Sequence, residues 1–207
     1  MCYPRPMANA WPPLPQPSGP LASVSTLEQW LDLPEDSEGE WVDGRLEEEE
    51  VPDAVHELAV SWLIEVLRAW LGSRGFVFGS DLKVLTAANR GRRPDLVALL
   101  PGSARPPRHG PLRVPPDLIV EVVSPSPRDE RRDRIEKMSE YAAFGVRYYW
   151  LVDPALGSFE IFERTGAGHY QKLAGVVSGR IDPVPGCPGL VLDIDALWAE
   201  LERLGDD

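Results

Sequence analysis

The sequence predicts an α/β or α+β fold in which a central mixed β-sheet is flanked by helices. Three short apolar runs, residues 92–100, 116–124 and 148–153, are rich in β-branched or aromatic residues and predict buried strands. Residues 53–71 and 128–144 predict the two principal helices. The succession of strand, helix and strand between 116 and 153 is typical of a right-handed parallel crossover.

The N-terminal part of the chain is divided by composition. Residues 1–24 are rich in proline and predict a disordered or surface arm, whereas residues 25–207 have the composition of a single domain. A short capped helix is expected at residues 25–31. An Asp-Gly pair within residues 40–47 favours a two-residue turn, so this segment is expected to form a hairpin.

Residues 53–71 carry the strongest helical pattern, with apolar residues at three- and four-residue spacing. Asp53 is expected to cap the first turn, and Gly72 is expected to end the helix. The next expected elements are strands at 76–78 and 81–85 joined by a Gly-Ser turn, a loop at 86–93, and an exposed Pro/Arg linker at 101–116.

The second principal helix, residues 128–144, follows a Ser-Pro-Ser-Pro entry and is expected to end at Gly145. Residues 158–163 alternate as an exposed antiparallel strand does. The last expected elements are strands within 170–177 and at 190–192 and a terminal helix at 195–204.

The length, charge and cysteine content of the chain limit the classes of protein to which it could belong. A length of 207 residues suits one domain, and a net charge of −12 argues against broad, nonspecific binding to nucleic acid. The charge is uneven, because residues 27–65 hold 14 acids and one base, whereas residues 90–147 hold 12 bases and 8 acids. Cys2 and Cys187 form neither a disulfide framework nor a zinc site, which favours a reducing cytoplasm. No apolar run approaches the about 18 residues that span a membrane.

Two acids lie on neighbouring expected strands. Asp95 stands at the mouth of one apolar run, and Glu121 lies inside the run Leu-Ile-Val-Glu-Val-Val. Burying a carboxylate in such a run is costly without a partner. Two carboxylates on adjacent strands repel unless a positive group lies between them, and oxygen ligands suit Mg²⁺ or Mn²⁺. The pair therefore predicts a metal site able to polarise a phosphodiester.

A lysine near these acids is expected from the following helix. Asp133, Lys137 and Tyr141 lie at four-residue spacing and therefore on one helical face. Lys137 is the only lysine between Lys83 and Lys172, in a region otherwise built from arginine. A compact ammonium at this position suits a role in orienting the nucleophile or stabilising developing charge.

Several further segments accompany these residues in a fixed order. They are Val42-Asp43-Gly44, His56, Arg93-Pro94-Asp95, residues 117–126, Asp133 with Lys137 and Tyr141, Gly145-Val146, residues 149–154, and Pro188-Gly189-Leu190. In their order and spacing the chain resembles the Uma-two restriction endonuclease family, within the PD-(D/E)XK nuclease superfamily. The resemblance covers nearly the whole expected domain.

The resemblance implies a restriction-endonuclease-like core and a metal-dependent nuclease site, with Asp95 and Glu121 as ligands of Mg²⁺ or Mn²⁺. It also implies that the catalytic lysine has moved from the strand to the next helix, here as Lys137. DNA is the implied substrate, and a homodimer is expected because cutting a duplex needs two sites. The chain departs from the family pattern at Glu47–Glu50, where members usually carry apolar or methionine residues.

Each site residue also has a purely structural interpretation. Glu121 is alternatively the partner of an arginine such as Arg93, and Lys137 is alternatively the i,i+4 partner of Asp133. His56 is more often a helix-start residue than a ligand. The further candidate site residues are Glu40, His56, Asp133 and Tyr141, with Glu40 interpreted as an edge-strand acid in preference to a ligand. The candidate phosphate contacts are Arg128, Arg131, Arg132 and Arg134.

Three functions are consistent with this pattern. The leading hypothesis is a metal-dependent endonuclease that hydrolyses DNA phosphodiester bonds. The second is a catalytically inactive binding or assembly module with the same fold, which the acidic balance and the missing strand lysine favour. The third is a hydrolase of RNA or of small phosphate esters, since an acidic surface suits a small substrate.

Overall fold

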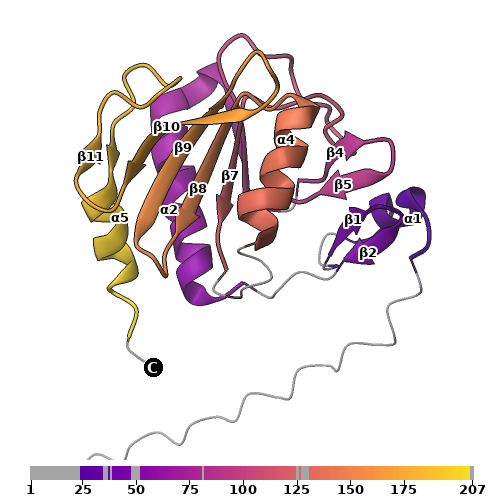
Figure 1. The fold of residues 1–207 in the computed structure, drawn as a ribbon, viewed down its shortest axis with the longest axis horizontal. Coiled ribbons are helices and arrows are strands. Elements are labelled where there is room, and N and C mark those ends of the chain that lie inside the picture. The colour runs from indigo at the N-terminus through magenta and orange to yellow at the C-terminus, as the bar shows by residue number, and fades with distance from the viewer. Residues whose placement is uncertain are drawn as a thin grey trace, which may run out of the picture.

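The computed structural model describes residues 24–34, 37, 39–47, 52–80, 82–124, 126 and 131–205. The expected N-terminal arm, residues 1–24, therefore lies outside the described residues apart from Val24. The same holds for Glu48–Glu50 and for residues 128–130 at the start of the second expected helix. Figure 1 shows the arrangement of the elements.

A six-stranded mixed sheet forms the centre of the fold, as the sequence predicts. Its strand order is β10-β9-β8-β7-β6-β3. The strands are β3 (Phe76–Phe78), β6 (Leu96–Leu99), β7 (Leu118–Val122), β8 (Tyr148–Asp153), β9 (Ser158–Arg164) and β10 (Tyr170–Val176). Strands β7 and β8 pair in parallel, and the other neighbours pair antiparallel. The three apolar runs of the sequence thus occupy adjacent strands.

Helices cover both faces of this sheet (Figure 1). Helix α2 (Ala54–Leu71) packs behind the sheet with α5 (Ile194–Leu201), and α4 (Met138–Phe144) lies in front of it. The expected cap of α2 is confirmed, because the Asp53 side chain accepts a hydrogen bond from the His56 N–H at 2.8 Å. Gly72 ends the helix.

The second principal helix differs from the uninterrupted α-helix expected over residues 128–144. Within the described residues, a π-helical segment η2 (Arg132–Lys137) precedes α4. A π-helical turn holds more residues than an α-helical turn, so it changes which side chains face inward, and such turns are frequent at functional sites. Here Asp133 and Lys137 both become buried.

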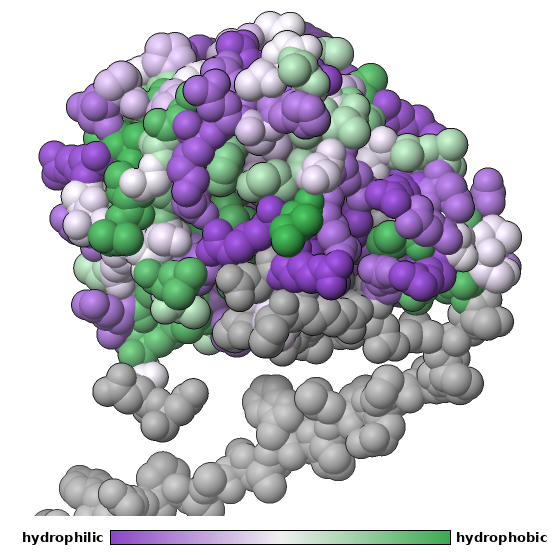
Figure 2. Space-filling model, viewed as in Figure 1, coloured by the Kyte–Doolittle hydropathy of each residue, from purple (hydrophilic) through white to green (hydrophobic). Residues whose placement is uncertain are grey.

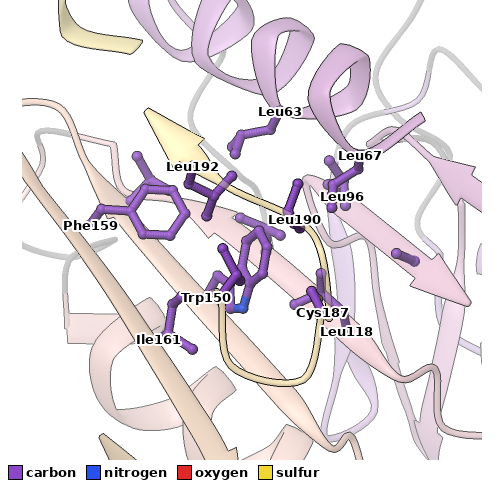
Figure 3. Close-up of a cluster of buried hydrophobic side chains, with 14 of the residues drawn as sticks. Leu63, Leu67, Leu96, Leu118, Trp150, Phe159, Ile161, Cys187, Leu190 and Leu192 are labelled. Carbon is purple, nitrogen blue, oxygen red and sulfur yellow. The ribbon is translucent and has the colours of Figure 1, made fainter. Parts of the chain in front are cut away.

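Successive side chains of β7 point to opposite faces of the sheet and enter two different hydrophobic cores. Leu118, Val120 and Val122 face the larger core under α2 and α5, whereas Ile119 and Val123 face the side of α4. In the larger core, Leu63 and Leu67 of α2 approach Leu118, Trp150 and Phe159 of the sheet (Figure 3). This side is apolar, so it supplies the main hydrophobic stabilisation of the fold.

A second, four-stranded sheet lies beside the first, with strand order β2-β1-β5-β4. Its strands are β1 (Glu40–Val42), β2 (Arg45–Glu47), β4 (Val84–Ala87) and β5 (Arg90–Arg92). The expected hairpin at 40–47 is confirmed, with positive φ values of 49° at Asp43 and 82° at Gly44. Helix α1 (Leu27–Leu31) buries Trp30 against this sheet, so close to Gly91 that a Cβ there would lie 2.2 Å from the indole ring.

Three features of this region differ from the expectations. Residues 86–93 are not simply a loop, because they contain the β4–β5 hairpin. The strands before and after the Gly-Ser turn, β3 and β4, also belong to different sheets. The expected strand at 81–85 begins later, at Val84. These pairings join segments that local patterns do not connect, and nonlocal contacts decide them.

The remaining described elements are short. They are η1 (Gly72–Arg74), β11 (Arg180–Ile181) and β12 (Leu192–Asp193). The terminal helix starts at Ile194 with Asp193 as its cap and ends earlier than expected. The Pro/Arg linker is fastened at Leu112, whose N–H donates to the Lys83 carbonyl at 2.9 Å. Every helix in the described part of the chain is too short or too polar to cross a bilayer.

Candidate active site

The two strand acids meet at one end of the central sheet. In the antiparallel register of β6 and β7, Leu96 pairs with Val120, which places Asp95 beside Glu121. The Val122 N–H donates to Asp95 Oδ2 at 2.7 Å, and His56 Nε2 lies 3.1 Å from the same oxygen. Asp95 retains some exposure, with 16% of its side chain accessible, whereas Glu121 is 1% exposed. The pair therefore has one partly open and one buried carboxylate.

Both oxygens of the Glu121 carboxylate are held by side chains of the η2–α4 helix. The Tyr141 hydroxyl donates to Oε1 at 2.6 Å, and Lys137 Nζ donates to Oε2 at 3.1 Å. Among the described residues Arg93 does not pair with Glu121: its guanidinium donates to the Ser37 carbonyl, and its backbone N–H donates to Glu40 Oε1 at 2.9 Å. Two side chains of the crossover helix thus converge on one acid of the strand that precedes it.

Lys137 lies at the centre of the acids. Its side chain is 4% exposed, and its ammonium lies 3.1 Å from Glu121, 3.3 Å from Asp133 and 3.8 Å from Glu40. The contact with Asp133 is the i,i+4 pair that the spacing suggested, but it occurs together with the contact to Glu121. The Tyr149 hydroxyl donates to the Asp133 carbonyl at 3.0 Å and anchors the π-helical segment to β8.

Glu40 is not the solvated edge acid that its position in a short hairpin suggested. Strand β1 is interior to its sheet, and the Glu40 side chain is 0% exposed. Arg92 donates to its Oε2 at 2.7 Å, and the Arg93 N–H donates to its Oε1. The pairing of β1 with β5 creates this environment, and it turns the acid toward Lys137.

The sequence interpretation overlooked the arginine network beside this site. The Arg92 side chain, 1% exposed, donates to Glu140 Oε2 at 2.6 and 3.0 Å as well as to Glu40. Thr86 donates its hydroxyl to the other oxygen of Glu140, and Arg90 donates to Glu140 Oε2 at 3.3 Å. The network fastens the four-stranded sheet to α4. Its only sequence signal was the polar strand Arg90-Gly91-Arg92 facing an acidic hairpin.

Burial and charge act in opposite directions on the buried acids. Burial raises the pKa of Glu40, but Lys137 and Arg92 outweigh burial and lower this pKa to about 2. Burial raises the pKa of Glu121 well above its usual value, because Lys137 offsets only part of that effect and nearby acids add to it. Burial likewise raises the pKa of Asp133. The raised pKa means that the charged form of Glu121 is disfavoured in this buried environment unless a proton or a further cation binds.

His56 completes the environment of Asp95. Burial lowers the pKa of His56, but the hydrogen bond to Asp95 and the charges of Asp95, Glu57 and Asp53 together outweigh burial and raise this pKa. The imidazole is 7% exposed, so the contact is shielded from solvent. His56 therefore has a partner in the site in addition to its place in the first turn of α2.

The four expected phosphate-binding arginines have different environments. Arg128 lies outside the described residues. Arg131 is exposed, with its Nε 3.7 Å from Glu136. Arg132 is buried, and Arg134 is held by Asp153 at 2.6 Å and Glu160 at 2.7 Å. Figure 2 shows hydrophilic side chains gathered around the lower end of the α4 ribbon and over the β4–β5 hairpin.

The donor set fits a hard divalent cation. Asp95 and Glu121 offer carboxylate oxygens from adjacent strands, and Glu121 carries more negative neighbours than Lys137 balances. Among the described residues, no three His, Cys, Asp or Glu side chains form a ready-made metal cage. Such an arrangement suits Mg²⁺, which is usually held by one or two carboxylates together with waters and substrate phosphates.

Comparisons with known proteins agree with this fold. The model of the Uma2 family, described as "putative restriction endonuclease", matches residues 24–195. The chain belongs to this family of restriction endonuclease-like proteins. A crystal structure from Anabaena variabilis ATCC 29413, titled as a putative nuclease belonging to DUF820, superposes with a TM-score of 0.67. The two chains share 20% identity over 85% of this chain and 98% of that chain, so the likeness establishes the fold. No curated protein matches.

Proposed function

We propose that the protein is a metal-dependent endonuclease that hydrolyses phosphodiester bonds in DNA. The observation that carries this proposal is the position of Lys137 Nζ, 3.1 Å from Glu121 on the strand beside Asp95. Two strand acids with an ammonium beside them are the groups that phosphodiester hydrolysis requires. Membership of a family described as restriction endonucleases supports the same reaction class.

Asp95 and Glu121 would hold Mg²⁺ or Mn²⁺ in this proposal. When bound, the ion would polarise the phosphodiester and lower the pKa of a coordinated water. His56 contributes by fixing Asp95, and Tyr141 contributes by fixing Glu121. Both are positioning residues, because each restricts the rotation of a carboxylate that must keep its orientation.

Lys137 would hydrogen-bond the attacking water and stabilise negative charge at the phosphate. Its ammonium has three donors, and Asp133 and Glu121 direct two of them toward the acids. A guanidinium would be a poorer substitute, because its planar fork distributes the charge over a larger group.

A plasmid-nicking assay tests the reaction. Wild-type protein with Mg²⁺ or Mn²⁺ should convert supercoiled DNA to open circles, and Glu121→Gln should reduce the rate by at least about 100-fold. Glu200→Gln, which alters an exposed acid on α5, is the matched control and should cleave at the wild-type rate. Equal nicking by wild type and Glu121→Gln, with both proteins folded by circular dichroism, would contradict the proposal.

A homodimer is part of the proposal, because two-fold symmetry would set one site on each strand of a duplex. Light scattering at micromolar concentration, with and without a short duplex, measures this directly. A mass equal to one chain under both conditions would remove the dimer while leaving single-strand nicking in place.

A noncatalytic binding module is the second candidate function. It is favoured by one observation, that both Glu121 oxygens already accept hydrogen bonds from Lys137 and Tyr141. Titration with Mn²⁺, followed by electron paramagnetic resonance, separates the two functions. Binding that Glu121→Gln abolishes supports the nuclease, whereas wild-type protein that leaves Mn²⁺ free supports the module.

A further inference from the structure

A pocket opens beside the candidate active site, between the start of α2 and the ends of β7 and β8. Its volume is about 270 Å³. The described residues that line it are Asp53, Val55, His56, Val123, Ser124, Pro154 and Ala155. This volume lies just below the lower end of small-ligand pockets, about 300 Å³. The pocket therefore suits one ring-sized group and excludes a duplex.

The walls and rim of the pocket differ in chemistry. Val55, Val123 and Pro154 supply apolar surface, while Ser124 and Asp53 place a hydroxyl and a carboxylate at the edge. Flat aromatic ligands bind between apolar walls and are then oriented by a few polar groups. A nucleobase has this pattern, with two π-faces and an edge of hydrogen-bond donors and acceptors.

His56 connects the pocket to the candidate site. The residue is 6% exposed, and its Nε2 faces Asp95 at 3.1 Å. Its Nδ1 has no hydrogen-bond partner among the described residues, and the nearest acid oxygen, on Glu57, is 3.8 Å away. Buried polar atoms are normally hydrogen-bonded. His56 lines the pocket and its Nε2 contacts Asp95, so a single imidazole ring joins the pocket wall to the candidate site.

We propose that this pocket receives one unpaired nucleobase of a DNA strand whose neighbouring phosphodiester lies at Asp95 and Glu121. This inference rests on the proposed nuclease function and specifies its substrate as single-stranded DNA or DNA with an unpaired nucleotide. A paired base is stacked and hydrogen-bonded inside the duplex, so it must leave the helix before a pocket can hold it. Stacking in the pocket would also bind a strand without the broad basic surface that a chain of net charge −12 lacks.

Filling the pocket tests the proposal. Ala155 lines the pocket and is exposed, so Ala155→Phe should fold and place a ring in the cavity. Leu156→Phe is the matched control, because Leu156 is the next residue, is 65% exposed and is not among the lining residues. Binding of a fluorescent single strand and of the matching duplex is measured by anisotropy in Ca²⁺, and Mn²⁺ binding is measured in parallel.

Wild-type protein should bind the single strand more tightly than the duplex, and Ala155→Phe should weaken single-strand binding about tenfold. Mn²⁺ binding by Ala155→Phe, and all binding by Leu156→Phe, should stay at the wild-type level. Unchanged single-strand binding by a folded Ala155→Phe protein, or a wild-type preference for duplex, would overturn the pocket assignment.

Abasic substitution tests the same idea on the unmodified protein. Removing one base at a time from the single strand should weaken binding about tenfold at a single position and little elsewhere. A uniform small effect at every position would overturn the proposal. If Glu121→Gln loses Mn²⁺ binding and nicking but Ala155→Phe has no effect on strand binding, the nuclease function stands and the nucleobase pocket is rejected. If Ala155→Phe weakens strand binding but the wild-type protein does not nick DNA, the nucleobase pocket stands and the nuclease function is rejected.

Discussion

Two buried cations organise the charged interior, and their surroundings differ. Arg92 donates through its fork to Glu40 and Glu140 at 2.6 to 3.0 Å. Lys137 stands at longer distances, 3.1 to 3.8 Å, from Glu121, Asp133 and Glu40. A planar guanidinium fixes carboxylates in one geometry, whereas an ammonium is a point charge that several groups share. The arginine network is suited to structure and the lysine network to chemistry.

Glu40 and Glu121 show the consequence of this difference. Despite the effect of burial, Glu40 is kept ionised with a pKa of about 2 by Lys137, Arg92 and the Arg93 N–H. Burial raises the pKa of Glu121 well above its usual value, because Lys137 offsets only part of the effect of burial and nearby acids add to it. A carboxylate that its protein partners leave incompletely neutralised has affinity left for a further cation. Burial alone therefore does not distinguish an acid fixed by arginine from a candidate metal ligand.

The largest expected effect on stability comes from removing the arginine. Arg92→Leu leaves Glu40 and Glu140 buried without their main partner, so we expect a loss of about 3–5 kcal/mol in the free energy of unfolding. Urea denaturation measures this loss. Arg203→Leu is the matched control, because its pair with Glu200 is exposed to solvent and should contribute little to stability. Equal effects of the two changes would show that the Arg92 network is not structural.

The two glutamates should respond in opposite directions to loss of charge. Glu40→Gln should cost about 3 kcal/mol near pH 7, corresponding to a pKa lowered from 4.5 to about 2. This contribution is present above pH 4.5 and is lost as pH falls toward 2, because the folded pKa is the lower one. Glu121→Gln should leave stability unchanged or raise it, since a neutral amide replaces an acid whose pKa is raised. Denaturation of both variants between pH 3 and 7 measures this difference in stability, because the range spans the ordinary glutamate pKa of 4.5. A larger cost for Glu121→Gln than for Glu40→Gln would reverse the assignment of roles.

Removing the lysine should affect activity more than stability. Lys137→Met should reduce nicking by at least about 100-fold, while unfolding costs less than in Arg92→Leu because Glu121 and Asp133 can take up protons. Lys172→Met, an exposed lysine on β10, is the control for loss of one positive charge. Nicking by Lys137→Met at the wild-type rate would exclude this lysine from the reaction.

The smallest expected effect comes from a single hydroxyl. Tyr141→Phe removes the donor to Glu121 Oε1 and should cost about 1 kcal/mol in the free energy of unfolding. Tyr170→Phe removes a comparable bond, to the Val146 carbonyl at 2.9 Å, and should cost a similar amount. Only Tyr141→Phe should weaken Mn²⁺ binding, because only Tyr141 orients a candidate ligand. Identical Mn²⁺ titrations for the two variants would assign Tyr141 a structural role alone.

Much of the central sheet was predictable from local pattern. The run that follows Asp95 and the run on both sides of Glu121 are apolar without alternation, which is typical of strands buried on both faces. Helix α2 was predictable because its apolar spacing, cap and terminal glycine agree. The contact between Lys137 and Glu121 was predictable because the helix that carries Lys137 starts beside the end of the strand that carries Glu121. The approach of the two acids and the lysine was thus encoded within short segments.

Other features depended on contacts between distant segments. Glu40 was expected at an edge, because nothing in a three-residue strand indicates that β5 will pair with it. Arg92 and Glu140 lie 48 residues apart, and their bond forms only when the small sheet packs on α4. The π-helical segment is likewise absent from a pattern typical of an ordinary helix. Local spacing reports neighbours within a turn or a strand. The sequence alone therefore determined that the two acids and the lysine lie close together and which sheet carries the acids. The tertiary structure decided which of the buried charges are neutralised, because charge pairing depends on the distances that packing creates.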